Sequence, residues 1–241
     1  MSKVITIEEA IEKVKDGMTI AIGGFSGVGV PLKCVEKIVE KGVKDLTLIS
    51  VVNSNQFANG KFDIAPLFVN KQVKRFITAH NGTNPYAMAQ EADGSLTVEF
   101  FPMGSWIEKL RAGGSGLGGI LTPTGVGTLV EEGKEKFNIG GKDYILELPL
   151  RADISFIKGY RADTLGNVEY RHCAANTNIV LATAADYTVA EVNEIVEVGQ
   201  INPERVGTQC VFVNSIVKGY DLEEQEKIYE KLWVSGGILK A

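Results

Sequence analysis

The chain has 241 residues, 44% of them hydrophobic and 23% charged, with a formal net charge of −5 at pH 7, so it can bury a full core and offers no basic face to a nucleic acid. It contains no run of the roughly 18 apolar residues that a membrane span needs, and its first residues lack the apolar core of a signal peptide. Because its three cysteines have no paired spacing, we expect reduced thiols and a cytoplasmic protein.

The first predicted elements are a helix, a strand and a second helix. Thr6 and Glu9 have the spacing of a capping box, which predicts the start of the first helix. An apolar strand at 18–22 then enters a glycine-rich loop at 23–31. Apolar residues at helical spacing predict a helix over Leu32–Lys41, with a glycine placed to end it.

The glycine-rich loop at 23–31 reads GGFSGVGVP. Glycine lets the main chain approach a ligand closely, and a strand that turns into a helix N-terminus presents free amides and a positive dipole end. The glycine spacing is neither the dinucleotide fingerprint nor a P-loop. We therefore predict a cradle for an anionic or phosphate-bearing ligand, with a simple strand-to-helix turn as the alternative.

Strands and helices continue to alternate through the first half of the chain. Strands are predicted at 46–52, 74–79 and 96–101, and helices at 84–92 and 105–112. The first of these strands is mostly apolar, which suits a buried parallel position. The alternation predicts an α/β architecture with an open, mostly parallel sheet flanked by helices.

The second half begins with a second cluster of glycines, at 112–133. So many glycines cost chain entropy unless close approach or unusual backbone angles are needed. A hairpin is predicted at 136–148, turning at a Gly-Gly pair, and further strands follow at 153–159, 187–191 and 211–217. We interpret residues 1–218 as one domain and residues 219–241 as a charged tail that is either helical or disordered.

Few side chains suggest catalytic chemistry by themselves. Glu131 and Glu132 precede a glycine and are the nearest candidates for a nucleophile, but the favoured interpretation is a solvated or turn-capping role. His80 ends a predicted strand, and we expect a satisfied strand-end residue there, with a place facing the cleft as the alternative. His172 beside Cys173 has no further ligands or third group, so we expect a packing role and no metal site.

Four motifs carry a specific resemblance: GGF at 23–25, RAGGSG at 111–116, LTPTGVGT at 121–128 and ADTLGN at 162–167. Together they resemble the alpha (A) subunit of family I coenzyme A-transferases. The match is closest to the acetate/acetoacetate and butyrate/acetoacetate type, also called 3-oxoacid CoA-transferases, and it runs from about residue 5 to about residue 218. The resemblance implies the CoA-transferase-like fold.

The resemblance also implies that the work is divided between two subunits. In this family the beta subunit supplies a glutamate that attacks an acyl-CoA thioester, and the resulting anhydride passes through a glutamyl-CoA thioester before a carboxylate takes the CoA. That glutamate lies in a Ser-Glu-Asn-Gly-type motif, which this chain lacks. We therefore expect no catalytic residue here, an alpha–beta heterodimer or heterotetramer, and CoA as a substrate with no tightly bound cofactor. The expected reaction moves CoA between a short-chain acyl-CoA and a free acid such as acetate, butyrate or acetoacetate.

The resemblance places CoA binding in the glycine-rich loop. The residues that match are Gly24, Phe25, Ser26, Gly27, Val28, Gly29 and Val30. Candidates for an acyl site or a cleft toward the partner are Met103, Gly113, Gly114 and Gly116. For the three glycines, close chain packing at the subunit interface is the alternative interpretation. Lys109 and Arg111 are cations that could pair with CoA phosphates, although such surface cations more often only aid solubility.

The chain departs from the family pattern at three segments. Pro-Met-Gly at 102–104 replaces Pro-Gln-Gly, Asn-Pro-Tyr at 84–86 replaces Asn-Pro-Glu, and AANTN at 174–178 replaces ARNFN. Because Met103 offers an apolar surface where Gln offers hydrogen bonds, we expect an acyl preference shifted away from acetoacetate. Two other functions stay open: a non-catalytic CoA- or metabolite-binding module of the same fold and, by fold analogy alone, a phosphosugar isomerase.

Overall fold

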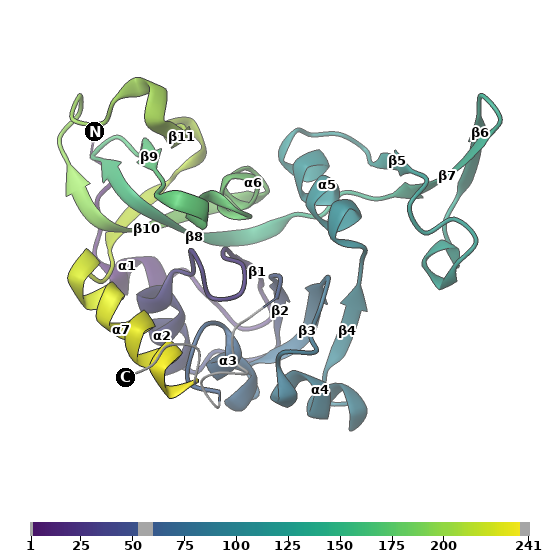
Figure 1. Cartoon of the computed structure of the whole chain (residues 1–241), viewed down its shortest axis with the longest axis horizontal. Helices are drawn as coiled ribbons and strands as arrows, with labels where there is room; N and C mark the ends of the chain where they lie inside the picture. The colour runs from purple at the N-terminus through teal and green to yellow at the C-terminus, as the bar shows by residue number, and fades with distance from the viewer. Residues whose placement is uncertain (1, 53–59, 237–241) are drawn as a thin grey trace.

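A computed structural model of the chain describes residues 2–52 and 60–236. The centre of the molecule is one nine-stranded sheet (Figure 1). Seven strands pair in parallel, and the two shortest additions, β9 and β11, pair antiparallel at one side. The strands are β1 (Thr19–Ile22), β2 (Leu46–Ile49), β3 (Val73–Thr78), β4 (Thr97–Phe100), β8 (Ala152–Asp163), β9 (Val168–Glu169), β10 (Ala185–Val196), β11 (Val206–Thr208) and β12 (Ser215–Lys218). The prediction of an open, mostly parallel sheet is confirmed.

Helices cover both faces of this sheet. They are α1 (Ile7–Ile11), α2 (Leu32–Lys41), α3 (Ala65–Val69), α4 (Pro85–Ala92), α5 (Met103–Gly114), α6 (Asn178–Thr183) and α7 (Leu222–Ser235), with 3-10 turns at Leu129–Glu131, His172–Ala175, Pro203–Arg205 and Cys210–Phe212. Within the described residues, none of the helices combines the length and the apolar character of a membrane span.

The molecule has two hydrophobic cores, one on each face of the sheet, because side chains along a strand alternate between the two faces. Ile20 and Ile22 of β1 belong to the core beneath α1, α2, α3 and α7, whereas Ala21 between them belongs to the core that contains Trp106 of α5 and Leu181 of α6. Successive side chains of a strand point to opposite faces, so one short apolar strand contributes to both cores.

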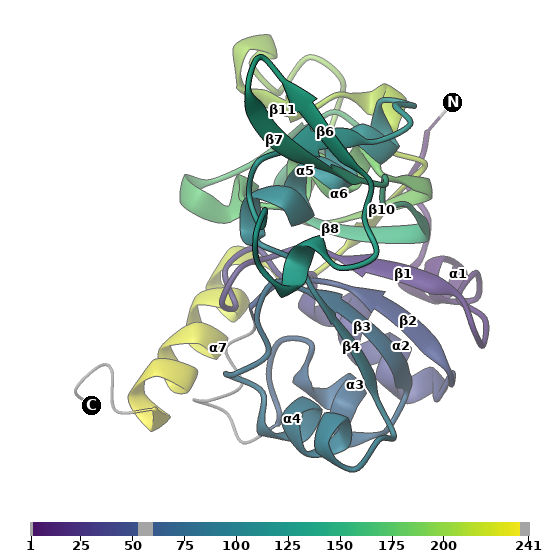
Figure 2. The ribbon, with the colours of Figure 1, turned by 90° about the vertical axis from the view of Figure 1, so that its right-hand side faces the viewer.

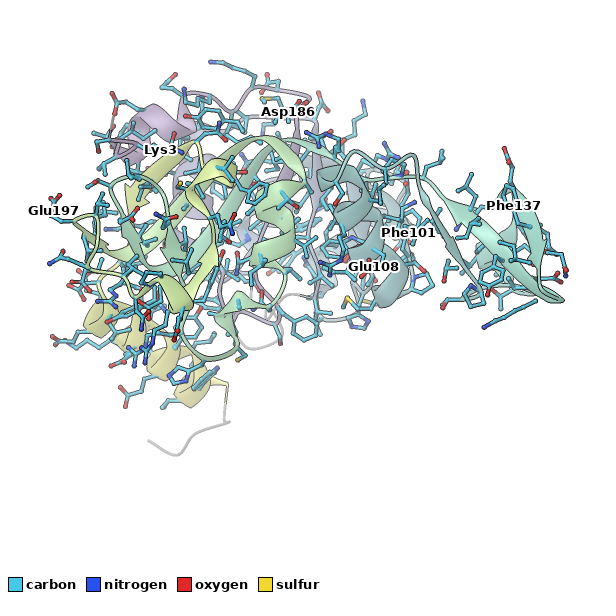
Figure 3. The ribbon with its side chains drawn as sticks, turned by 90° about the horizontal axis from the view of Figure 1, so that it is seen from above. Lys3, Phe101, Glu108, Phe137, Asp186 and Glu197 are labelled. Carbon is cyan, nitrogen blue, oxygen red and sulfur yellow. The ribbon has the colours of Figure 1, made fainter. Side chains whose placement is uncertain are left out.

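A three-stranded antiparallel sheet projects from the body as an arm (Figures 1 and 2). Its strands are β5 (Ile120–Thr122), β6 (Lys136–Ile139) and β7 (Lys142–Glu147). The predicted hairpin is present, and its turn residues Gly140 and Gly141 both have positive φ, as a two-residue turn of this kind requires. Figure 3 shows Phe137 on the arm, beyond Phe101 and Glu108 near its base.

Several element boundaries differ from the sequence prediction. β8 and β10 have twelve residues each, longer than the predicted 153–159 and 187–191, because they pair with one another along almost their whole length. The strand predicted at 211–217 begins instead as a 3-10 turn. α3, α6 and β5 were not predicted, since segments of three to six residues are too short to show a period.

Candidate functional site

The loop of the predicted CoA-binding residues lies at the carboxyl edge of the sheet. β1 to β4 are parallel neighbours, so the loop after β1, His80 after β3 and Met103 after β4 all follow strand ends at one edge. The segment after β2 reaches the loop directly, since the Ser26 amide donates to the Val52 carbonyl at 2.6 Å. Phe25 and Met103 remain 41% and 38% exposed, so this edge presents apolar side chains to its surroundings.

The loop itself is a tight, strained turn. Phe25 and Val28 exchange backbone hydrogen bonds of 3.0 Å, and Ser26 between them has a φ of 50°, a left-handed conformation that non-glycine residues rarely adopt. Gly29 also has positive φ, and a side chain there would lie 2.7 Å from the carbonyl of Ala174. Glycine is therefore required at this position by both the backbone angle and the close packing.

Three polar residues at 176–178 hold the loop in place from beneath. The Asn176 side chain donates to the Val28 carbonyl at 2.8 Å, and the Asn178 side chain donates to the Gly29 carbonyl at 2.9 Å. The Thr177 hydroxyl accepts from the Gly24 amide and donates to the Gly24 carbonyl, both at 3.1 Å. The sequence marked this segment only as a departure from the family pattern, and its role in positioning the loop was missed.

The N-terminus of α2, predicted to offer amides to a ligand, is partly occupied from within the chain. Pro31 provides no side-chain cap, and the Cys34 amide donates to a carboxylate oxygen of Glu191 at 2.8 Å. Within the described part of the chain, the amides of Gly27, Gly29 and Val30 have no acceptor. The loop amides are thus donors left for a ligand beside the partly occupied first turn of the helix.

A buried polar cluster of Cys34, Lys158 and Glu191 lies next to the loop. Lys158 donates to the Gly159 carbonyl and to the Asn193 side chain, both at 2.7 Å, and burial lowers the pKa of its ammonium to about 8. Burial likewise raises the pKa of the Glu191 carboxyl and of the Cys34 thiol. All three shifts favour the uncharged forms.

The four candidates for the acyl site have different surroundings in the structure. Met103 opens α5 at the carboxyl edge, as described above. A side chain at Gly113 would lie 2.0 Å from the Leu150 carbonyl, and one at Gly114 would lie 2.3 Å from the Thr183 hydroxyl, so packing within this chain accounts for both glycines. Gly116 has a positive φ of 70° and meets no other atoms.

Charged residues of the glycine-rich region have structural partners. Lys109 is not a surface cation, because it is buried and pairs with the buried Glu147 of β7 at 2.8 Å. This interaction ties α5 to the arm, and Lys134 also pairs with Glu147. Arg111 pairs with Glu108 on its own helix. Neither cation therefore stands free beside the loop.

Glu131, a sequence candidate for the nucleophile, has structural partners within the chain. Glu131 accepts the Gly127 amide at 2.7 Å and pairs with Lys136 at 2.8 Å, which agrees with the turn-capping interpretation. In the part of the chain that the structure describes, no group of three His, Cys, Asp or Glu side chains could hold a metal ion.

Comparisons with known proteins agree with this geometry. The family described as Coenzyme A transferase matches residues 4–219. The alpha subunit of acetate CoA-transferase from Escherichia coli (strain K12) is 45% identical over 216 residues, covering 90% of this chain and 96% of that protein. The alpha subunit of acetoacetyl-CoA:acetate/butyrate CoA transferase from Clostridium acetobutylicum is 42% identical over 217 residues, covering 90% of this chain and 98% of that protein.

A solved structure shows the same fold at low sequence identity. The acyl-CoA transferase YdiF of E. coli O157:H7, described as a thioester complex with CoA, superposes with a TM-score of 0.80 at 19% identity. The match covers 90% of this chain and 47% of the other, so the chain spans about half the length of YdiF.

Proposed function

The chain belongs to the coenzyme A transferase family, and we propose that it is the alpha subunit of an enzyme that moves CoA between a short-chain acyl-CoA and a free carboxylic acid. Two relatives are named as alpha subunits, one of an acetate CoA-transferase and one of an enzyme for acetoacetyl-CoA with acetate or butyrate. Such names imply a beta subunit. The nucleophilic glutamate comes from that subunit, because this chain contains no Ser-Glu-Asn-Gly-type motif.

The observation that carries the proposal is the glycine-rich loop at the carboxyl edge of the sheet. Its amides at Gly27, Gly29 and Val30 have no acceptor among the described residues, and Thr177 holds the loop through two hydrogen bonds to Gly24. Donors that are already oriented bind an anionic or carbonyl oxygen without the cost of ordering the loop. This supports CoA binding at residues 24–30.

The acyl group is assigned to the neighbouring part of the same edge. Phe25 and Met103 expose apolar surface there, and a beta subunit that covers them would exclude water from the reacting thioester. CoA is a substrate in this scheme and no resident cofactor takes part. The three free thiols, Cys34, Cys173 and Cys210, support a reducing, cytoplasmic setting.

The test is CoA exchange by the purified chain with and without a beta subunit that carries the Ser-Glu-Asn-Gly-type motif. We expect no transfer from butyryl-CoA to acetate by the chain alone and clear transfer by the co-expressed pair. Exchange by the single chain would contradict the division of labour. CoA binding by the pair without turnover would favour the non-catalytic module, and aldose–ketose conversion of a sugar phosphate would favour the isomerase.

A further inference from the structure

A cavity of about 460 Å³ lies between α7 and the glycine-rich loop. In Figure 1 α7 lies on the side of the molecule away from the arm and from β4. Val28 and Gly29 form one wall of the cavity, and α7 forms the opposite wall. The volume falls within the range of about 300 to 1,000 Å³ that is usual for small-molecule sites. Met103, the candidate for the acyl site, does not line it.

Part of α7 borders this cavity, while Tyr229 and Leu232 of the same helix also pack against the core. A surface helix normally buries its apolar stripe against a core. Leu222, Tyr229 and Trp233 face the cavity, and Trp233 remains 38% exposed. The helix is anchored to the body, since the Tyr229 hydroxyl donates to the Gly27 carbonyl and Leu232 is buried in the core. The apolar side chains that line the cavity therefore lie on a helix that is anchored to the body.

The cavity reaches a buried cation that lacks a counter-ion. Lys158 is 4% exposed and lines the cavity. An ammonium has three donors, and the two acceptors of Lys158, the Gly159 carbonyl and the Asn193 side chain, are both uncharged. Among the described residues Lys158 forms no ion pair: Glu191 acts on it only from beyond ion-pair distance and is engaged with the Cys34 amide. A buried charge without a partner is costly, and a carboxylate would relieve that cost.

The other charged side chains that line the cavity have opposite signs on the body and on α7. Lys158 and Arg171 belong to the body, whereas Glu226 and Glu230 lie on α7. Lys218, farther from the cavity, adds positive charge near Lys158. An anionic group is thus attracted to the body side of the cavity, while an apolar chain is accommodated along Leu222, Tyr229 and Trp233.

We propose that this cavity binds a monocarboxylate of short to medium chain length, with its carboxylate at Lys158 and its hydrocarbon chain against α7. The site goes beyond the proposed transfer reaction, because it lies on the α7 side of the loop and its occupation requires neither the beta subunit nor CoA. Because Val28 and Gly29 also line the cavity, a ligand that fills it would lie against the CoA-binding loop.

Isothermal titration of the full chain with hexanoate tests the proposal, with hexylamine as the probe of opposite charge. Glu226→Trp fills the cavity from α7, and Glu223→Trp, which lies on the same helix but outside the cavity, is its matched control. We expect saturable hexanoate binding to the natural chain and to Glu223→Trp, binding weakened by about tenfold or more in Glu226→Trp, and no binding of hexylamine.

A charge-removing variant separates the role of Lys158 from that of the apolar wall. Lys158→Met should weaken hexanoate binding while hexanol binding is retained. Should this variant fail to fold, the Glu226→Trp and Glu223→Trp pair still decides the question. No saturable binding of hexanoate, equal binding by both tryptophan variants, or tighter binding of hexylamine would each overturn the proposal. None of these outcomes bears on CoA exchange, which is assayed separately with the beta subunit.

Discussion

The backbone amide of Cys34 donates a hydrogen bond of 2.8 Å to the carboxylate of Glu191, across 157 positions of sequence. An internal side chain from β10 thus satisfies one of the free amides at the start of α2, where the helix dipole favours an anion. The other oxygen of Glu191, Oε1, has no partner among the described residues. Burial raises the pKa of this carboxyl, so its neutral form is favoured.

Two substitutions of Glu191 test whether the Cys34 amide needs a negatively charged acceptor or only a hydrogen-bond acceptor. Glu191→Gln keeps an oxygen for the Cys34 amide, so we expect the free energy of unfolding to change by less than about 1 kcal/mol. Glu191→Ala removes the acceptor and leaves a cavity, with an expected loss of about 2 to 4 kcal/mol. Urea unfolding at neutral pH measures both. An equal loss in the two variants would mean that the negative charge itself is needed.

The sequence predicted the sheet and the loop because both depend on local patterns. Apolar runs such as 46–52, alternating with helical spacing, predict parallel strands without knowledge of their partners. Contacts of the loop with 176–178 depend instead on packing between residues about 150 positions apart, which no local pattern reveals. Lys109 has the charged neighbours of a surface residue, and only its pairing with Glu147, 38 positions away, shows that it is buried.

The Thr177 hydroxyl should matter both to stability and to CoA binding. Thr177→Val preserves the shape but removes two hydrogen bonds to Gly24, so we expect a loss of about 1 to 2 kcal/mol. A less ordered loop should also raise the KM for acyl-CoA in the assembled enzyme. Thr183→Val is the control, since among the described residues that hydroxyl bonds only a carbonyl of its own helix. Equal KM values for the two variants would contradict the positioning role of Thr177.

Two glycine-to-alanine substitutions should have opposite effects. The added methyl at Gly23 would lie 1.8 Å from the Asn178 side-chain oxygen, which accepts the Lys158 amide. Gly23→Ala should therefore destabilise the protein by about 2 kcal/mol or more. Gly104, in the first turn of α5, meets no atoms within 4 Å, so Gly104→Ala should be neutral or stabilising by up to about 1 kcal/mol. Thermal unfolding compares them, and similar shifts in Tm would refute the close packing at Gly23.

Met103 should influence which acid the enzyme prefers. Met103→Gln introduces hydrogen-bonding groups at the start of α5, so kcat/KM for acetoacetate should rise relative to that for butyrate. Met88 is similarly exposed, at 46%, but lies on α4, and Met88→Gln is the matched control. The measurement is CoA exchange by the alpha–beta pair with several carboxylates. An unchanged profile in Met103→Gln would remove this residue from the acyl site.

Lys158 should make stability rise with pH under mildly alkaline conditions. Its folded pKa is about 8, below the ordinary value of 10.5, so between these values the unfolded chain binds more protons than the native one. Stability therefore increases with pH in this window, and the destabilisation by the buried charge is complete below it. Relative to Lys158→Met, the natural chain should gain about 2 kcal/mol between about pH 7.5 and 9.5. Groups that titrate in both proteins, such as the Cys34 thiol, largely cancel in this difference. Urea unfolding at a series of pH values measures it, and parallel curves for the two proteins would show that Lys158 has an ordinary pKa.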